Sequence, residues 1–344
     1  MMLRKIFSTT VFIFFIQLGF SQSFNKIKLD HYLNELAENN KFMGSVAVLD
    51  NDKIIYTNST GFSNIETQQR PNDKTTYGIG SISKVFTSVL ILKAIEERKI
   101  TLSTKLNEYF PSVKNSDKIT IGNLLNHRSG IHNFTNDKDF LEWNTQKKSE
   151  TEMLQIITNG GSDFEPDSKA DYSNSNYILL SYILEKIYNQ PYSNILSEKI
   201  IKKLGLRNTY FGNNINEINE SFSYKFNESW IKQTQTNPSI PLGAGAIFST
   251  PTDLTKFASA LFNVKIISKQ SLKSMIEMKD NFGYGIFEML FKEKIGYGHR
   301  GGIDGFNSVF TYFPKEKISI AIISNGNNYD INSVLFVIEN DVFK

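Results

Sequence analysis

The chain of 344 residues contains no cysteine. This absence excludes disulfide bonds, a thiol nucleophile, a cysteine-bound zinc ion and a lipid-modified N-terminal cysteine. Because 40% of the residues are hydrophobic and 13% are aromatic, the chain can build a large packed core without cross-links.

Clusters of charge are also missing. The formal net charge is +3, and the lysines and arginines are scattered along the chain. The sequence therefore shows no basic cluster of the kind that binds nucleic acid. The sequence has no dinucleotide-binding glycine fingerprint and no P-loop. His127 and His132 lie close together but lack a third ligand at a metal-site spacing. We therefore expect no nucleic acid, no metal and no cofactor.

No hydrophobic run is long enough to span a membrane. The apolar stretch 6–20 follows the basic residues Arg4 and Lys5 and is shorter than the roughly 20 residues that a membrane-spanning helix needs. Gly19 and Ser21 then form the small-x-small pattern that is typical of a signal-peptide cleavage site. We expect a signal peptide over residues 1–21, cleaved after Ser21, and a secreted or periplasmic protein with no stable membrane span. The alternative is an uncleaved N-terminal anchor.

The periodicity of the apolar residues predicts strands at both ends of residues 22–344 and helices between them. Helices are expected at 27–39, 81–97, 151–158, 176–188, 250–261 and 331–342, and strands at 44–49, 54–58, 284–290, 295–300, 308–313 and 318–324. This order predicts an α/β (α+β) fold, in which an antiparallel sheet is flanked by the N- and C-terminal helices and carries an inserted all-helical domain. We assign about 24–80 and 246–344 to the α/β part and about 81–245 to the helical part of one unit.

Ser81 and Lys84 form a Ser-x-x-Lys motif at the start of the helix expected at 81–97. A serine hydroxyl needs an adjacent base, and a lysine three residues later lies on the same face of a helix. Burial lowers the pKa of a lysine, so Lys84 can act as a neutral base or as a local positive charge. The same spacing occurs at 23–26 and 229–232. The motif alone would equally fit a capping serine followed by a surface lysine.

The sequence Tyr172-Ser173-Asn174 forms a polar turn before an apolar helix. A phenol near a lysine can relay a proton between nucleophile and leaving group. Asn174 can hydrogen-bond both Lys84 and a substrate carbonyl. The alternative is a polar helix cap with a packed tyrosine.

The sequence His299-Arg300-Gly301-Gly302 ends a predicted strand. Two glycines let a substrate lie against the strand, where the Gly302 N–H can join the Ser81 N–H as an oxyanion donor. His299 or Arg300 can offer positive charge to a substrate carboxylate. The alternative is a glycine-rich hairpin bend.

Together these motifs resemble the serine β-lactamase and penicillin-binding-protein-like family, on the class C β-lactamase and D-alanyl-D-alanine carboxypeptidase side. The matching segments are 44–48, 81–87, 119–131, 243–250 and 298–306. The resemblance implies that Ser81 is the acylated nucleophile, Lys84 its partner and Tyr172 the general acid or base. It further implies that Asn174 is a substrate-side amide, and that Ser81 and Gly302 form the oxyanion hole.

One residue departs from the family pattern. Class C β-lactamases usually carry lysine where this chain has His299, which weakens a claim of efficient β-lactam hydrolysis.

His127 is expected to support the floor of the cleft, and His31 to lie on the surface. The segment 133–167 is expected to line one wall of the cleft, through four aromatic residues, Phe134, Phe140, Trp143 and Phe164.

The function implied is that of a serine hydrolase that acts through a Ser81 acyl-enzyme on an amide or ester. The substrate is expected to be a small molecule or a peptidoglycan-derived compound, such as a β-lactam, a D-Ala-D-Ala-type peptide or a small ester. One alternative is an esterase or D-amino-acid peptidase without β-lactamase activity. Another is a non-catalytic binding protein on the same scaffold.

Overall fold

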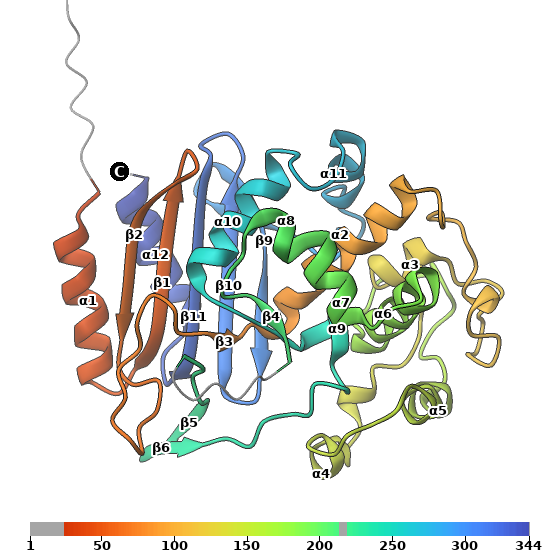
Figure 1. Cartoon of the computed structure of the whole chain (residues 1–344), viewed down its shortest axis with the longest axis horizontal. Helices are drawn as coiled ribbons and strands as arrows, with labels where there is room; N and C mark the ends of the chain where they lie inside the picture. Colours follow the sequence, from red (N-terminus) through yellow and green to blue (C-terminus); the bar gives the residue numbers. More distant parts are fainter. Residues whose placement is uncertain (1–23, 213–218, 344) are drawn as a thin grey trace, which may run out of the picture.

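The computed structural model, which describes residues 24–212 and 219–343, is built around a six-stranded antiparallel sheet (Figure 1). Its strands in spatial order are β2 (Lys53–Thr60), β1 (Phe42–Asp50), β11 (Ile318–Asn327), β10 (Phe306–Phe313), β9 (Lys294–Ile303) and β8 (Phe287–Phe291). The N-terminal hairpin pairs with the C-terminal strands through β1 and β11. The prediction that strands from both ends of the chain form one sheet is therefore confirmed.

Helices cover both faces of the sheet because its strands bury side chains on both sides. In β11, Ile320 and Ile322 pack on one face, whereas Ala321 and Ile323 pack on the other. The first face is covered by α1 (Lys26–Glu38) and α12 (Ile331–Val342). The second is covered mainly by α10 (Pro251–Phe262), as Figure 1 shows. Helix α2 (Ser83–Glu96) packs beside α10, where Phe86 stacks on Phe257.

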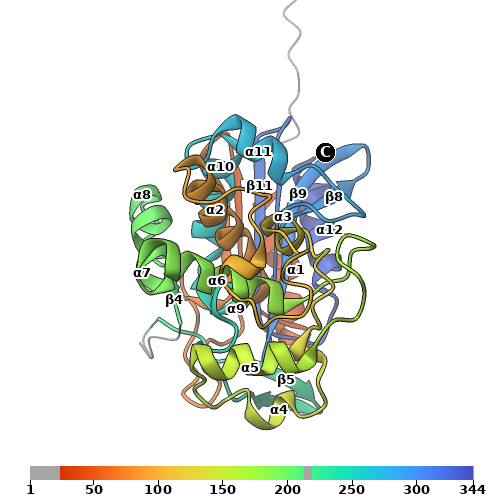
Figure 2. The same cartoon turned by 90° about the vertical axis from the view of Figure 1, so that its right-hand side faces the viewer.

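The remaining helices are η2 (Leu106–Glu108), α3 (Ile121–Leu125), η3 (Phe134–Asn136), α4 (Phe140–Trp143), α5 (Glu150–Gly160), α6 (Asn174–Tyr188), α7 (Tyr192–Leu196), η4 (Ser197–Ile201), α8 (Lys202–Leu204), α9 (Leu242–Gly245) and α11 (Lys269–Met275). Most of them, among them α4, α5 and α6, lie on the side turned to the viewer in Figure 2. Helix α2 packs against both α6 and α9. Nearly all of its residues are buried, as an apolar helix between two layers must be.

The expectation of an all-helical insertion over 81–245 is wrong in two places. β4 (Tyr210–Phe211) joins a small sheet with β3 (Tyr77–Gly78) and β7 (Ile247–Ser249). β5 (Tyr224–Asn227) and β6 (Ser229–Lys232) form a separate hairpin that contacts β11. These strands have two to four residues, which is too short for an alternating pattern to stand out in the sequence.

The start of the Ser81 helix also differs from the expectation. Residues 80–82 form a 3₁₀ turn, η1 (Gly80–Ile82), and the α-helix begins at Ser83. Ser81 therefore lies in the tight turn that leads into α2.

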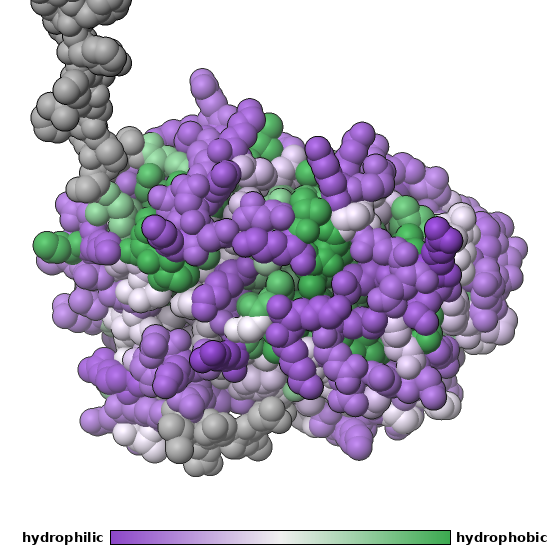
Figure 3. Space-filling view, turned by 45° about the horizontal axis from the view of Figure 1, so that its top comes forward, coloured by the Kyte–Doolittle hydropathy of each residue, from purple (hydrophilic) through white to green (hydrophobic). Residues whose placement is uncertain are grey.

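Hydrophilic residues predominate on the face shown in Figure 3, and the hydrophobic residues there form separate patches. Within the described residues, no helix is both long and apolar enough to cross a bilayer. The predicted signal peptide, residues 1–21, lies outside the residues that the structure describes.

The end of β9 lies directly against η1, and glycines permit this approach. A Cβ atom on Gly301 would stand 2.0 Å from the carbonyl oxygen of Ile79. A Cβ atom on Gly80, whose φ is +51°, would stand 2.7 Å from the Gly302 nitrogen. Ser81 is therefore held beside the backbone of Gly302.

We predict opposite effects for two neighbouring substitutions in β9. Gly301→Ala should destabilise the fold by about 1–3 kcal/mol, because the new methyl group collides with a backbone carbonyl that cannot easily move. Gly302→Ala should change stability by less than about 0.5 kcal/mol, because only the Asn307 side chain lies near its Cβ position, at 4.0 Å. Urea unfolding of both variants tests this. Equal losses would show that the β9–η1 contact does not constrain the fold.

Candidate active site

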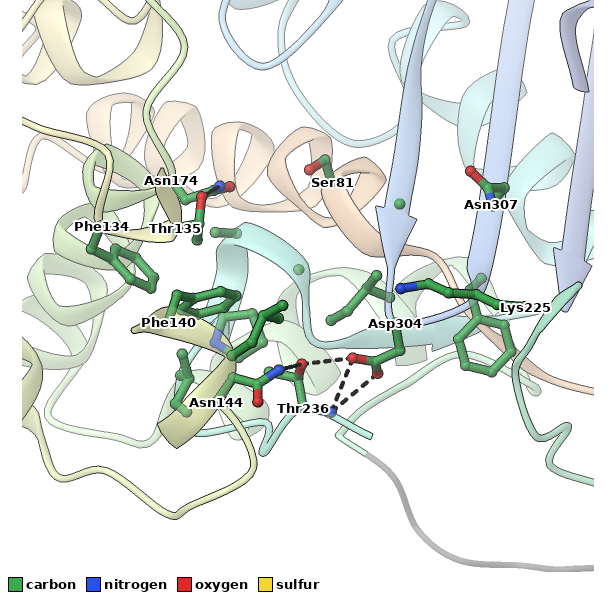
Figure 4. Close-up of a pocket in the computed structure, with 18 residues that line it drawn as sticks. Ser81, Phe134, Thr135, Phe140, Asn144, Asn174, Lys225, Thr236, Asp304 and Asn307 are labelled. Atoms are coloured by element: carbon green, nitrogen blue, oxygen red, sulfur yellow. Dashed lines mark hydrogen bonds between the residues drawn. The ribbon is translucent and has the colours of Figure 1, made fainter. Parts of the chain in front are cut away.

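A cavity of about 490 Å³ opens beside Ser81, at the C-terminal end of β9 (Figure 4). Three of the predicted site residues line it: Ser81, Asn174 and Gly302. The other predicted residues of the site lie behind this surface.

Lys84 contacts three other residues of the site. Its Nζ lies 3.2 Å from Ser81 Oγ, 2.7 Å from Asn174 Oδ1 and 2.8 Å from the Ala244 carbonyl oxygen. The side chain is fully buried. The predicted proximity of Ser81, Lys84 and Asn174 is therefore present. The Ala244 carbonyl is a further partner of Lys84, for which the sequence analysis had predicted no role.

Burial holds the pKa of Lys84 well below its usual value, because the charged form loses its hydration. A neutral amine has two hydrogens and one lone pair. The two hydrogens can be donated to Asn174 and Ala244, whose oxygens only accept. The lone pair then remains for the Ser81 hydroxyl proton. The same three oxygens would also accept the three hydrogens of an ammonium group, so it is the lowered pKa that favours the first of the two roles considered for Lys84, a neutral base.

Tyr172 lies immediately before α6 and faces Lys84. The Lys84 Nζ is 4.9 Å from the centre of the Tyr172 ring. The phenol oxygen is buried and forms no hydrogen bond of good geometry within the described part of the chain. Burial raises the pKa of Tyr172, and the neighbouring Ser81 hydroxyl partly offsets this rise. The phenol is thus protonated at neutral pH and close to the nucleophile.

His127, expected to support the cleft floor, in fact contacts Tyr172 directly. The two rings stack with centroids 4.5 Å apart. His127 Nδ1 accepts a hydrogen bond from the Ser173 N–H at 3.1 Å, and its carbonyl accepts one from the Asp171 N–H at 2.9 Å. One buried residue therefore fixes the residues before and after Tyr172 as well as its ring.

The structure corrects the interpretation of His299 and Arg300 as cations for a substrate carboxylate. His299 is buried, and this burial is the main cause that lowers its pKa to about 3; Lys84 adds to the effect when its amine is protonated. The imidazole is therefore neutral near pH 7, and its Nδ1 donates to the Arg300 carbonyl. The Arg300 side chain is exposed and donates to Asn332 on α12 at 2.7 Å. Neither residue lines the cavity.

The two glycines have different roles. Gly302 borders the cavity next to Ser81, whereas the missing Cβ of Gly301 makes room for the Ile79 carbonyl. Gly301 therefore brings β9 close to η1, and only Gly302 faces the cavity.

The aromatic wall is partly as predicted. Phe134 and Phe140 line the cavity, and Trp143 packs against both of them, with ring centroids 6.1 and 5.2 Å away. Phe164 does not line it.

Several lining residues had no signal in the sequence. Lys225 comes from the β5–β6 hairpin, and Asp304 from the turn after β9. Within the described residues, no group of three or more histidine and acidic side chains could hold a metal ion. His31 lies on the surface, as expected.

The sequence of this chain also matches a known protein family. A family model described as Beta-lactamase matches residues 29–332. The chain belongs to the beta-lactamase family. It is a hydrolase of that family, and the resemblance seen in its motifs is confirmed.

Two of the similar proteins have names that describe hydrolases of D-configured compounds. The chain is 26% identical to a teichoic acid D-alanine hydrolase of Staphylococcus aureus (strain MRSA252) over 312 residues, which are 88% of this chain and 74% of the relative. It is also 26% identical to a solved D-stereospecific amidohydrolase from Streptomyces sp., with a TM-score of 0.78 over 90% of this chain and 97% of that one.

The fold recurs in more distant proteins. A D-amino acid amidase from Ochrobactrum anthropi SV3 superposes with a TM-score of 0.83 at 21% identity, over 92% of this chain and 98% of the amidase. A penicillin-binding protein from Bacillus halodurans superposes with a TM-score of 0.80 at 19% identity, over 90% and 98%. The predicted fold class is therefore confirmed.

We predict that His127 positions Tyr172. His127→Phe keeps an aromatic ring but removes the acceptor for the Ser173 N–H, and an unpaired buried N–H costs about 1–3 kcal/mol. His127→Asn keeps a short acceptor and tolerates the local φ of +59° but loses the stacked ring. Both should slow acylation of Ser81 by an ester, by about tenfold or more.

The pH dependence distinguishes this role from direct proton transfer. The pKa of His127 lies well below its usual value, so neither substitution should move the pH–rate profile near neutrality. A shifted profile, or wild-type acylation in a folded His127→Phe protein, would contradict the positioning role.

We also predict that acid destabilises the protein partly through His299. Between pH 6.5 and about 3, the unfolded imidazole binds a proton that the folded one excludes, so stability falls as the pH falls. The contribution is at most about 1.4 kcal/mol per pH unit. In urea unfolding from pH 7 to 4, His299→Gln should flatten this slope, whereas His31→Gln, at an exposed position, should not. Identical slopes in all three proteins would refute the prediction.

Proposed function

We propose that the protein is a serine hydrolase that forms an acyl-enzyme at Ser81 and acts on amides or esters of D-amino acids. The contact between the buried Lys84 amine and Ser81 Oγ carries this proposal. A neutral amine at that position can remove the serine proton, which an N-capping serine with a surface lysine would not require.

The first half of the reaction forms the acyl-enzyme. Ser81 Oγ bonds to the substrate carbonyl carbon as its proton passes to Lys84 Nζ. The carbonyl oxygen becomes an oxyanion, which the N–H groups of Ser81 and Gly302 would stabilise. The bond to the leaving amine or alcohol then breaks, and that group receives the proton from Lys84 through the Tyr172 hydroxyl.

The second half releases the product. Water bonds to the acyl carbon and gives a proton to the same relay, the bond to Ser81 Oγ breaks, and the serine regains its hydrogen. The products are an acid and the free enzyme. All the groups needed are protein groups on the described chain, and none of them has to titrate near neutral pH.

The choice of D-amino acid derivatives draws on the relatives. The teichoic acid D-alanine hydrolase and the D-stereospecific amidohydrolase share about a quarter of their residues with this chain over most of its length. The neutral His299 supports the same choice, because it lacks the positive charge that the family's lysine offers a β-lactam carboxylate. We further propose that residues 1–21 are removed and that the mature enzyme is secreted or periplasmic.

Intact-mass spectrometry over time tests this function. Wild-type protein is mixed with D-alanine p-nitroanilide, its L-enantiomer, a short-chain p-nitrophenyl ester and a penicillin. We expect turnover of the D-anilide and the ester through a transient adduct on Ser81, and little penicillin consumption. Ser81→Ala should abolish turnover and should cost about 1 kcal/mol of stability at most, because only the hydrogen bond between Ser81 Oγ and Lys84 Nζ is lost.

A matched variant tests the proton relay. Tyr172→Phe keeps the ring that stacks on His127, and should fold normally but acylate at least about a hundredfold more slowly. Unchanged hydrolysis in a folded Ser81→Ala protein would refute the proposed function. Stable penicillin adducts without turnover of the D-anilide would favour a penicillin-binding role, and no reaction at all would favour a binding protein.

A further inference from the structure

Two charged side chains line the cavity beside Ser81. They are Lys225, from β5, and Asp304, from the turn between β9 and β10. All other described residues of the lining are apolar or uncharged. Figure 4 shows Lys225 and Asp304 on one side of the cavity and Ser81 on another. A substrate attached to Ser81 can therefore extend toward a charged end.

Asp304 is already engaged in holding the cavity together. Its carboxylate accepts hydrogen bonds from the Thr236 N–H at 3.1 and 3.2 Å and from the Thr236 hydroxyl at 2.7 Å. The Thr236 hydroxyl in turn accepts from Asn144 Nδ2 at 3.1 Å. These bonds join three separate segments of the chain. We therefore assign Asp304 a structural role in the cavity floor.

Lys225 differs, because its charge is not used in this way. Within the described residues, its Nζ forms no ion pair within 4.0 Å and no hydrogen bond, although its charge partly offsets the rise that burial causes in the pKa of Asp304. Lys232, on the other strand of the hairpin, has its ammonium 3.6 Å from Glu66. One lysine of the hairpin is thus paired on the outside, and the other faces the cavity without an ion-pair partner.

The position of Lys225 is fixed by its neighbours. The preceding residue, Tyr224, is buried, and its hydroxyl is hydrogen-bonded to Glu66 at 2.9 Å and to the Ile65 N–H at 3.0 Å. The turn after β9 packs on the same residue, since a Cβ on Gly305 would stand 2.7 Å from the Tyr224 nitrogen. The β5 backbone therefore cannot move away from the cavity without losing these contacts.

We propose that Lys225 forms a subsite for an anionic group, a carboxylate or a phosphate, on the substrate whose carbonyl Ser81 attacks. This inference rests on the proposed function and narrows its substrate class. Lys225 is exposed, but its ammonium borders a cavity whose other lining is mostly apolar. Walls of low dielectric constant focus the field of such a charge into the cavity, so an anion that enters is attracted to it. Lysine suits either anion, since it acts as a compact point charge.

The test uses substrate pairs of equal shape that differ only in charge. D-Glutamyl and D-glutaminyl p-nitroanilide place the charge on the acyl side. D-Alanyl-4-aminobenzoate and D-alanyl-4-aminobenzamide place it on the leaving group, and D-alanyl-4-aminophenylphosphonate replaces the carboxylate by a phosphate-like group. Each is measured with wild type, Lys225→Gln and the matched control Lys232→Gln.

We expect wild type to prefer the anionic member of at least one pair by about tenfold in kcat/KM at low salt. This preference should weaken as NaCl is added. In Lys225→Gln the ratio should fall to near one, whereas Lys232→Gln should keep it. The substrate pair whose ratio of kcat/KM values falls in Lys225→Gln shows whether the acyl side or the leaving group of the substrate faces Lys225.

Failure of this inference is separable from failure of the proposed function. Ser81-dependent turnover of all substrates, with no charge preference or with a preference that survives Lys225→Gln, would overturn the subsite and leave the function intact. Absence of Ser81-dependent turnover for every substrate would overturn both.

Discussion

The hydrogen bonds of the buried Lys84 amine join the three segments on which the site depends. Lys84 belongs to α2, Asn174 begins α6, and Ala244 lies in α9. A buried polar group must be paired, so these helices have to converge where its partners are. The same contacts place Ser81 at the cavity and Tyr172 beside the amine. The contacts that hold these three helices together are therefore the same contacts that place the nucleophile beside its base.

Burial also gives the site an unusual charge distribution. It lowers the pKa of Lys84, His127 and His299 together, so the cationic form of each is disfavoured. A second positive charge near Lys84 would oppose protonation of the amine during catalysis. Lys225, in contrast, is exposed at the far side of the cavity. Proton transfer and attraction of an anion can thus use separate lysines that do not disturb each other.

The sequence predicted the parts of the site that depend on local spacing. Ser81 and Lys84 are one turn apart, and the buried strands β1 and β11 have continuous apolar runs, so both were recognisable. The stack of His127 on Tyr172 was not, because the two residues are far apart in the sequence and each looks like an ordinary turn residue. The choice between His299 and Arg300 as a cation for the substrate stayed open, because strand alternation alone does not tell which side faces the cavity.

The segment that was hardest to predict from the sequence contributes directly to the cavity. The β5–β6 hairpin has four-residue strands and little periodicity, yet it supplies the one cation of the described lining. The acylating groups lie on elements buried between two layers, where a change in volume or charge is costly. A hairpin at the cavity edge can change its side chains with little effect on that core. Selectivity in this fold is therefore best sought in the segments that carry no motif, since the motifs specify only the chemistry common to the family.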